Sequence, residues 1–402
     1  MADFYQTGII TTLHRLGKPS LERIEKELEG FARFRPIALV LPALYSEFEG
    51  PAMPKIVEEL SKVNYLSEVL LVLDKASEKE FQQVRRLMAP VPGDVKIIHN
   101  DGKRITEIYD TFKRNGLDVG QRGKGRSVWL GNGYVIAGGK SDVIALHDCD
   151  IVNYSRELLA RLCYPVVNPN LDYIFCKGYY SRVTSKMHGR VTRLLVTPLV
   201  RSLQKLCGHN GFLEFIDGFR YCLAGEFAMI TDMARVNRIP WDWGLEVGSL
   251  AEVYRNYSPR RVCQVDIADT YEHKHQALSS GDPEKGLMKM TIDICKTIFR
   301  VLASEGVVFS EGFFKSLSVA YLRLAEDTMI KYEADAAVNG LEFDRHEEAM
   351  AVEAFMRAIS LAAQIFMENP GGTPLIPNWN RVTSAIPGIL EMLKMAVDED
   401  NA

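Results

Sequence analysis

The segment Val143-Ile-Ala-Leu-His147-Asp148-Cys149-Asp150 decides the fold of this 402-residue chain. It begins as a short apolar run, which is typical of a buried strand, and ends in two carboxylates. Three earlier apolar runs predict further strands, and helical patterns separate the runs. The predicted strands are 36–42, 69–73, 95–98 and 143–147, and the predicted helices are 53–63, 78–88 and 128–137. Strands that alternate with helices predict an α/β fold with a parallel, doubly wound sheet.

In such a sheet, ligands bind beyond the carboxyl ends of the strands. Those ends carry the segment from Pro42 to Glu47, then Asp74, and finally Asp148 to Asp150. We therefore expect the functional site at this edge of the sheet.

The rest of the chain divides by pattern into four parts. Residues 1–35 form a helical lead-in, 36–170 hold the α/β units, and 171–282 mix strand-like pieces at 173–177 and 262–265 with helices and turns. Residues 283–402 predict a helical C-terminal extension with helices near 284–304, 310–333, 343–367 and 381–397. The acidic tail 398–402 is a candidate for disorder.

Composition excludes several classes of protein. The net charge of −4 provides no basic field for nucleic acid or an anionic membrane. There is no run of about 18 apolar residues, so no transmembrane helix is expected, and the first residues lack a signal-peptide pattern. The seven cysteines include no CxxC pair and indicate reduced thiols in a cytoplasmic protein.

The pair Asp148 and Asp150 is the strongest chemical signal. Carboxylates spaced i, i+2 at a strand end can address a divalent cation and a nucleotide ribose together, and hard oxygen ligands suit Mg²⁺ or Mn²⁺. The alternative is a pair of surface acids that opens a turn. Because the Asp148 and Asp150 pair follows the fourth predicted strand, the sequence favours a metal and nucleotide site about as much as a surface turn.

Two basic segments are candidates for anion binding. Gly123-Lys124-Gly125 lies before a predicted helix, where glycines allow close backbone approach and the lysine offers a charge to phosphate. The segment from His188 to Arg193 groups basic and hydroxyl side chains around Gly189, which suits a phosphate or carboxylate. Taken alone, each is more commonly a solvated surface turn.

Two further segments offer polar groups to a site. If the stretch 271–275 is extended, His273 and His275 point the same way, and one of them can complete a metal site. Glu246 follows Trp241 and Trp243 between glycines, which suits hydrogen bonding to sugar hydroxyls. The alternatives are solvent-facing histidines and a helix-capping acid.

Hydrolase, zinc-protease and dehydrogenase patterns are absent from the sequence, because it has no G-x-S-x-G, H-E-x-x-H or G-x-G-x-x-G motif.

Taken in order, the motifs resemble those of the retaining GT-A glycosyltransferases of the glucosyl-3-phosphoglycerate synthase type, with mannosyl-3-phosphoglycerate synthases as close relatives. The resemblance covers roughly residues 35–280. It rests on these segments: 41–44 (LPAL), 123–125 (GKG), 148–150 (DCD), 189–192 (GRVT), 223–226 (LAGE), 244–248 (GLEVG) and His273.

The resemblance implies a GT-A fold, a Rossmann-like mixed sheet flanked by helices, with a nucleotide-sugar-binding region at 36–170 and an acceptor-binding region at 171–282. For the donor, the resemblance implies that Lys124 contacts the phosphates, that Asp148 faces the ribose and sugar, and that the base is lined by Pro42, Ala43, Leu44 and Glu47. It implies that Asp150 and His273 hold Mg²⁺ or Mn²⁺, that Glu246 binds the transferred hexose, and that the Leu223 backbone lies near the anomeric carbon. The implied contacts to 3-phosphoglycerate are Gly189, Arg190, Thr192 and His275.

The expected reaction moves glucose from an NDP-glucose donor to 3-phosphoglycerate, in a cytoplasmic protein whose long C-terminal helices suggest a homodimer. Transfer of mannose from GDP-mannose is the nearest alternative. A catalytically silent nucleotide-sugar-binding protein is an alternative of a different class, against which the presence of Asp148, Asp150 and His273 argues. A nucleotidyltransferase is a third, and the segment 42–51 lacks the glycine- and arginine-rich loop that it would favour.

Overall fold

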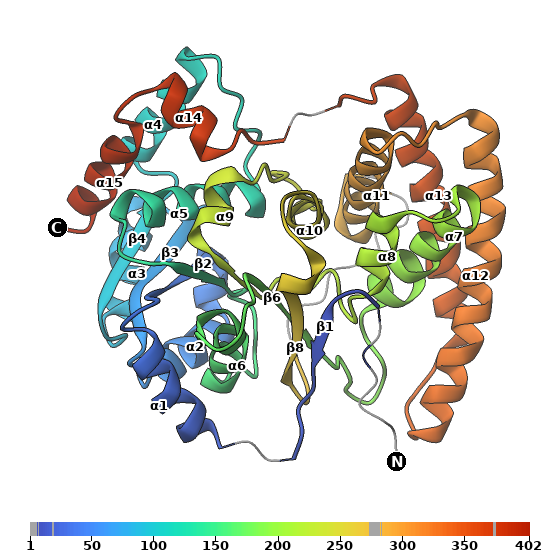
Figure 1. Cartoon of the computed structure of the whole chain (residues 1–402), viewed down its shortest axis with the longest axis horizontal. Helices are drawn as coiled ribbons and strands as arrows, with labels where there is room; N and C mark the ends of the chain where they lie inside the picture. Colours follow the sequence, from blue (N-terminus) through green and yellow to red (C-terminus); the bar gives the residue numbers. More distant parts are fainter. Residues whose placement is uncertain (1–5, 7, 18–19, 273–281, 283, 373–374) are drawn as a thin grey trace.

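A single sheet lies across the left and centre of the view in Figure 1, with a group of helices beside it on the right. The computed structural model describes residues 6, 8–17, 20–272, 282, 284–372 and 375–402, and within them the sheet has eight strands in the order β1-β8-β6-β7-β5-β2-β3-β4. The strands are β1 (Thr11–Leu13), β2 (Ile37–Leu44), β3 (Leu66–Asp74), β4 (Asp94–His99), β5 (Val143–Leu146), β6 (Phe175–Tyr180), β7 (Phe227–Ile230) and β8 (Val262–Ala268).

The sheet is mixed, because β7 runs antiparallel to both of its neighbours, β5 and β6, whereas the other pairs are parallel. The parallel sheet expected from the alternation of strands and helices is therefore wrong at this strand, and the mixed sheet implied by the resemblance is confirmed. The chain leaves β6 at the carboxyl edge, builds residues 181–226 there, and re-enters the sheet from that same edge. This return reverses β7 and keeps the long connection beside the expected site.

Each face of the sheet carries its own layer of helices. One face packs against α1 (Leu21–Phe31), α2 (Ala52–Leu60), α3 (Glu78–Met88) and α6 (Arg156–Val167). The opposite face packs against α4 (Lys103–Arg114), α5 (Lys124–Gly138) and α9 (Thr231–Val236). The period-2 alternation of β2 serves both cores, since Leu39 faces the first layer and Val40 the second.

The remaining helices form a second group beside the sheet, on the right of Figure 1. They are α7 (Thr197–Cys207), α8 (Gly211–Asp217), α10 (Leu245–Asn256), α11 (Gly286–Ser304), α12 (Glu311–Val338) and α13 (Arg345–Glu368), together with the short π-helix η2 (Val191–Val196). The 3-10 turn η1 (Tyr45–Glu49) contacts α2 instead, and η3 (Pro259–Arg261) leads into β8. In α13, an apolar stretch is long enough for a membrane span, with a mean hydropathy of 1.4, and half of it is buried in this group. Core helices of globular proteins share that composition.

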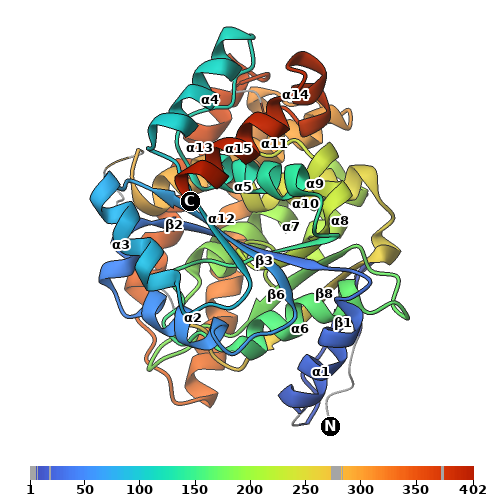
Figure 2. The ribbon, with the colours of Figure 1, turned by 90° about the vertical axis from the view of Figure 1, so that its left-hand side faces the viewer.

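The last two helices, α14 (Trp379–Ala385) and α15 (Ile389–Asp400), return to the sheet layer and pack over α4 and α5 (Figure 2). Trp379 stacks on Trp129 of α5 with ring centroids 4.3 Å apart. Gly133 leaves room for that ring, since a Cβ there would lie 2.0 Å from Trp379 Cζ2. The helical extension at 283–402 is thus shared between two parts of the molecule.

Three sequence expectations differ from the structure. The predicted helix at 381–397 is two helices, because Pro387 and Gly388, with φ of 81°, interrupt it. The tail 398–402 is docked: Asn401 Oδ1 accepts a hydrogen bond from Ile97 N at 2.9 Å and Asn401 Nδ2 donates to Ile97 O at 2.8 Å. The lead-in 1–35 contains strand β1 as well as helix α1, because β1 pairs with β8. Helix α4 and strand β7 were not predicted.

Candidate active site

A pocket of ≈ 760 Å³ opens at the carboxyl edge of the sheet. Twelve of the predicted site residues line it: Pro42, Ala43, Leu44, Glu47, Lys124, Asp148, Asp150, Gly189, Arg190, Thr192, Leu223 and Glu246. The predicted ligand His273 and the predicted acceptor contact His275 lie outside the described residues. Side chains up to 204 residues apart in sequence, from Pro42 to Glu246, thus face one cavity.

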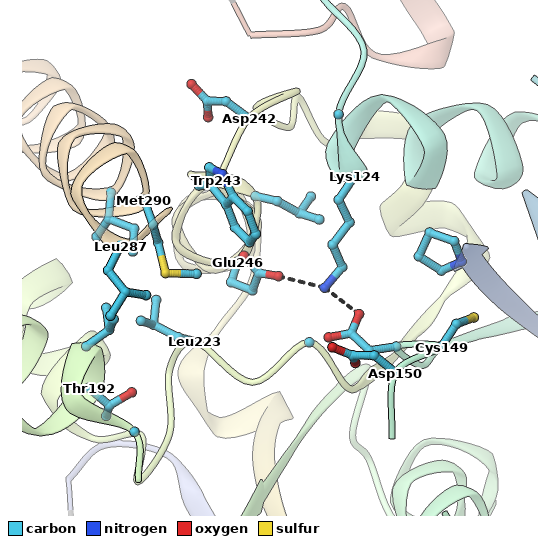
Figure 3. A pocket seen from close by; sticks show the side chains of 18 of the residues that line it. Lys124, Cys149, Asp150, Thr192, Leu223, Asp242, Trp243, Glu246, Leu287 and Met290 are labelled. Atoms are coloured by element: carbon cyan, nitrogen blue, oxygen red, sulfur yellow. Dashed lines mark hydrogen bonds and ion pairs between the residues drawn. The ribbon is translucent and has the colours of Figure 1, made fainter. Parts of the chain in front are cut away.

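Lys124 holds the centre of the pocket (Figure 3). Its Nζ lies 2.5 Å from Asp148 Oδ1 and 3.0 Å from Glu246 Oε1. Burial disfavours the charge, but the two carboxylates outweigh it and raise the pKa of Lys124 well above its usual value. Burial raises the pKa of Asp148, an effect that Lys124 opposes and the charge of Asp150 increases. The centre is thus a lysine shared between two carboxylates, with a third carboxylate beside them.

Three secondary-structure termini meet at this cluster. Lys124 is the first residue of α5, Glu246 lies in the first turn of α10, and Asp148 follows β5. Gly225 permits the approach, because a Cβ there would lie 2.3 Å from Asp148 Oδ2 and 2.8 Å from Lys124 Nζ.

The glycines of the 123–125 motif have a packing role. A Cβ on Gly123 would lie 2.3 Å from Trp241 O, and one on Gly125 would lie 1.9 Å from Pro240 O. The loop that carries Lys124 is therefore pressed against the backbone at 240–241. Gly123 also lines the pocket, so close approach of a ligand to this backbone stays a prediction beside the packing role.

The described residues provide two carboxylates that suit a metal site. Asp148 and Asp150 both line the pocket just after the end of β5. Figure 3 shows Asp150 projecting into it, and carboxylate oxygens are the ligands that Mg²⁺ and Mn²⁺ favour. In the part of the chain that the structure describes, no three His, Cys, Asp or Glu side chains converge as a complete metal site. Tyr271 lines the pocket, and the predicted ligand His273 lies outside the described residues.

A buried carboxylate that the sequence analysis did not single out anchors that wall. Glu226 Oε1 accepts a hydrogen bond from Tyr271 at 2.5 Å and Oε2 accepts one from Tyr180 at 3.0 Å. The two tyrosine rings stack with centroids 3.7 Å apart. Burial, reinforced by Asp148, raises the pKa of Glu226 to about 7. The LAGE motif contained Glu226, but no spacing rule joins it to tyrosines 46 and 45 residues away.

The motifs assign no role to two other polar groups at or near the site, one of which, Asp74, ends a predicted strand. Asp74, at the end of β3, accepts hydrogen bonds from Ser127 and, at 2.8 Å, from Asn100. Burial raises the pKa of this carboxyl. Lys177 is buried in β6 and donates to Ala224 O at 2.7 Å, which fixes the backbone next to Leu223. The sequence signal that points to Lys177 is a lysine within an otherwise apolar strand pattern.

The opposite end of the pocket is basic. Gly189 adopts φ of 74°, a left-handed conformation that favours glycine, and starts the turn into the π-helix η2. Arg190 lies at this turn, and its Nε donates to Glu348 Oε1 at 2.7 Å. The buried Thr192 hydroxyl has no hydrogen-bond partner among the described residues. An orphan hydroxyl beside an arginine suits an anionic ligand with several acceptor oxygens.

Comparison with known proteins places the chain in a family. It is 52% identical over 402 residues to the glucosyl-3-phosphoglycerate synthase of Persephonella marina, with both chains covered completely. The chain belongs to the glucosyl-3-phosphoglycerate synthase family. The enzyme of that name from Methanococcoides burtonii is 41% identical, over 99% of this chain and 98% of its own. No family model matches the sequence.

Solved structures confirm the predicted GT-A fold of this glucosyl-3-phosphoglycerate synthase family member. The enzyme from Mycobacterium tuberculosis, in complex with Mg²⁺ and UDP, is similar with a TM-score of 0.53 and 20% identity, covering 76% of this chain and 89% of its own. The mannosyl-3-phosphoglycerate synthase of Rubrobacter xylanophilus has a TM-score of 0.54 and 19% identity, with 71% and 80% covered. The same mycobacterial enzyme has been solved with Mn²⁺, UDP-glucose and phosphoglyceric acid.

Proposed function

We propose that this family member transfers glucose from an NDP-glucose donor to 3-phosphoglycerate, forming glucosyl-3-phosphoglycerate and NDP. One observation carries the proposal: a single pocket joins the Lys124–Asp148–Glu246 cluster at the strand ends to a basic turn at Arg190. The two ends suit a nucleotide-sugar and an anionic acceptor, respectively. Membership of the glucosyl-3-phosphoglycerate synthase family favours glucose over mannose.

The donor occupies the end built by the region 36–170. Pro42, Ala43 and Leu44 form the carboxyl end of β2, Glu47 follows in η1, and together they form the wall for the base. Asp148 accepts hydrogen bonds from the ribose or sugar hydroxyls, and Lys124 binds the donor phosphates. To do so, Lys124 exchanges part of its contact with the carboxylates for the diphosphate.

The metal position suits Mg²⁺ or Mn²⁺, with Asp150 and His273 as its protein ligands. Bound there, the cation would neutralise the charge that builds on the departing diphosphate. The carboxylate of Asp150 in the pocket supports this assignment, as does the presence of Mg²⁺ or Mn²⁺ with UDP in the mycobacterial structures.

The acceptor occupies the end built by the region 171–282. Arg190, the backbone at Gly189, the Thr192 hydroxyl and His275 bind its phosphate and carboxylate. Glu246 accepts hydrogen bonds from the hexose, and the Leu223 carbonyl lies near the anomeric carbon. We expect retention of configuration with attack on the face from which the diphosphate departs, so no carboxylate nucleophile is assigned.

The experiment is a transfer assay with purified protein and Mg²⁺. The donors are UDP-, GDP- and ADP-linked glucose and mannose, the acceptor is 3-phosphoglycerate, and NDP release is measured with the product identified by mass spectrometry. Acceptor-dependent release from a glucose donor, lost in Asp150→Ala, is the expected result. Donor binding without release would reject this acceptor, and release only with GDP-mannose would reject glucose.

We further propose that the protein acts in the cytoplasm as a homodimer, without membrane or nucleic-acid partners. Seven unpaired cysteines, a net charge of −4 and the long α11–α13 group support this assignment. Light scattering after size-exclusion chromatography tests the dimer, and a monomer mass at micromolar concentration would reject it.

A further inference from the structure

Two carboxylates of the C-terminal helix α13 contact the arginine at the acceptor end of the pocket. Arg190 Nε lies 2.7 Å from Glu348 Oε1, and Arg190 Nη2 lies 2.8 Å from Glu347 Oε2. Glu348 also receives Arg193 Nη1, at 2.9 Å, through its second oxygen. Arg190, Arg193, Glu347 and Glu348 thus form a four-charge cluster between the π-helix η2 and α13, and the cluster is neutral as a whole.

The two carboxylates differ in their freedom to move. The Glu348 side chain is 6% exposed and is held by two arginines, so its rotation would leave a buried charge unpaired. The Glu347 side chain is 46% exposed and has solvent as an alternative partner. Its hydrogen bond with Arg190 lowers the pKa of Glu347, so this carboxylate is charged near neutral pH.

Other contacts make the same helices the support of the turn. Glu342, between α12 and α13, donates its N–H to Ser185 O at 2.8 Å. The guanidinium carbon of Arg193 lies 4.9 Å from the ring centre of Tyr332, and Tyr321 donates to Leu194 O at 2.8 Å, both from α12. The acceptor end of the pocket is therefore positioned by two helices, α12 and α13, that contribute none of the described residues that line it.

We propose that Glu347 and Glu348 control acceptor binding through Arg190, with opposite effects. Glu348 is a positioning residue that fixes the guanidinium by its Nε and leaves Nη1 and Nη2 directed to the ligand. Glu347 occupies one of those donors in the free protein and is displaced by the acceptor. This inference rests on the proposed function, in which Arg190 binds 3-phosphoglycerate.

Charge balance gives the reason for the displacement. The four-charge cluster is neutral before the acceptor arrives, and 3-phosphoglycerate brings a carboxylate and a phosphate to it. If Glu347 stayed on Arg190, like charges would meet at one guanidinium. The acceptor has more oxygens to offer than Glu347 and is not tethered to the surface, so it replaces the weaker, exposed ion pair.

The test compares Glu347→Gln and Glu348→Gln with the matched control Glu353→Gln, an exposed carboxylate on the same helix. Acceptor KM, donor KM and kcat are measured, and 3-phosphoglycerate binding is titrated by calorimetry without donor. Glu347→Gln is expected to tighten acceptor binding by about 1.5- to 5-fold, as the loss of an exposed competing ion pair predicts. Glu348→Gln is expected to weaken it at least about tenfold, because Arg190 loses its charged anchor. Donor KM should stay unchanged in all three.

The outcomes separate this inference from the proposed function. Acceptor binding that weakens in both variants, or a donor KM that shifts as much as the acceptor KM, would assign the carboxylates a purely structural role and overturn the inference. In either case, glucose transfer by the unaltered protein would leave the proposed function standing. If the unaltered protein transfers no glucose, the proposed function fails. The 3-phosphoglycerate affinities that calorimetry gives for the two variants and the wild type still decide the inference. Should Glu348→Gln fold poorly, the Glu347→Gln arm and the milder Glu348→Asp variant decide the outcome.

Discussion

Replacing Lys124 by methionine tests the central cluster of the pocket most directly. The change removes the cation that lies 2.5 Å from Asp148 and 3.0 Å from Glu246, and leaves two carboxylates that share a half-enclosed space. Removing one partner of a buried ion pair costs 3–5 kcal/mol, and the Lys124 and Asp148 side chains are 26% and 27% exposed. Solvent screening therefore lowers the expected loss to about 2–3 kcal/mol.

Thermal unfolding gives the first measurement. With an unfolding entropy of about 2.1 cal/mol/K per residue, a chain of this length should lose about 2–4 °C in Tm. Lys103→Met, on the exposed start of α4, is the matched control and should stay close to the wild type. The double variant Lys124→Met/Asp148→Asn also removes one of the two carboxylates that lost their cation, and with it their mutual repulsion, so it should regain at least half of the lost Tm.

The transfer assay should separate stability from function. Lys124→Met is expected to lower kcat/KM for the donor by at least about 100-fold, because a charge aimed at the leaving diphosphate is lost. The double variant should show no recovery of activity despite its higher Tm. If Lys124→Met has the same Tm as the wild type, or if the double variant has a Tm no higher than that of Lys124→Met, the ion pairs of Lys124 do not stabilise the fold.

Three further predictions concern other buried polar groups. Burial lowers the pKa of His147 to about 3, so the imidazole stays neutral in the folded protein but binds a proton in the unfolded chain below about pH 6.5. At pH 5 the wild type should therefore have lost about 2 kcal/mol of its free energy of unfolding, a loss that His147→Phe should not show in denaturant unfolding. Burial lowers the pKa of Lys177 to about 8, so the protein takes up a proton when it unfolds between pH 8 and 10.5. As the pH rises from 7 to 9.5, the free energy of unfolding of the wild type should therefore increase by about 2 kcal/mol relative to that of Lys177→Met. Asn401→Ala removes two hydrogen bonds to Ile97 and should cost about 2 kcal/mol in thermal unfolding at neutral pH.

Each of the three has a clear opposite result. Parallel acid-unfolding curves for the wild type and His147→Phe would mean that the imidazole is protonated in the folded protein. A stability difference between the wild type and Lys177→Met that does not change with pH would contradict a depressed lysine pKa. An unchanged Tm in Asn401→Ala would mean that the docking of the tail contributes nothing.

The local pattern of the sequence determined the α/β layout up to β5 and the chemistry of individual segments. Apolar runs bounded by turn residues identified β2 to β5, and 3.6-residue periodicity identified α2, α3, α5 and the long helices α11–α13. These features depend on neighbours in sequence, which is why periodicity detects them. The motifs also named twelve residues that line one pocket, and the family comparison agrees with the resemblance on which their roles rest.

Only the tertiary structure decided how distant segments meet. Strand β7 is reversed because the chain returns to the sheet from the carboxyl edge. Strand β1 joins the sheet by pairing with β8, and the C-terminal tail docks on Ile97, which lies about 300 residues earlier in the chain. The partners of Arg190 lie some 158 residues further along the chain on α13. Ion pairs and hydrogen bonds of this kind depend on the folded positions of both partners, and no local spacing in the sequence encodes the distance between them.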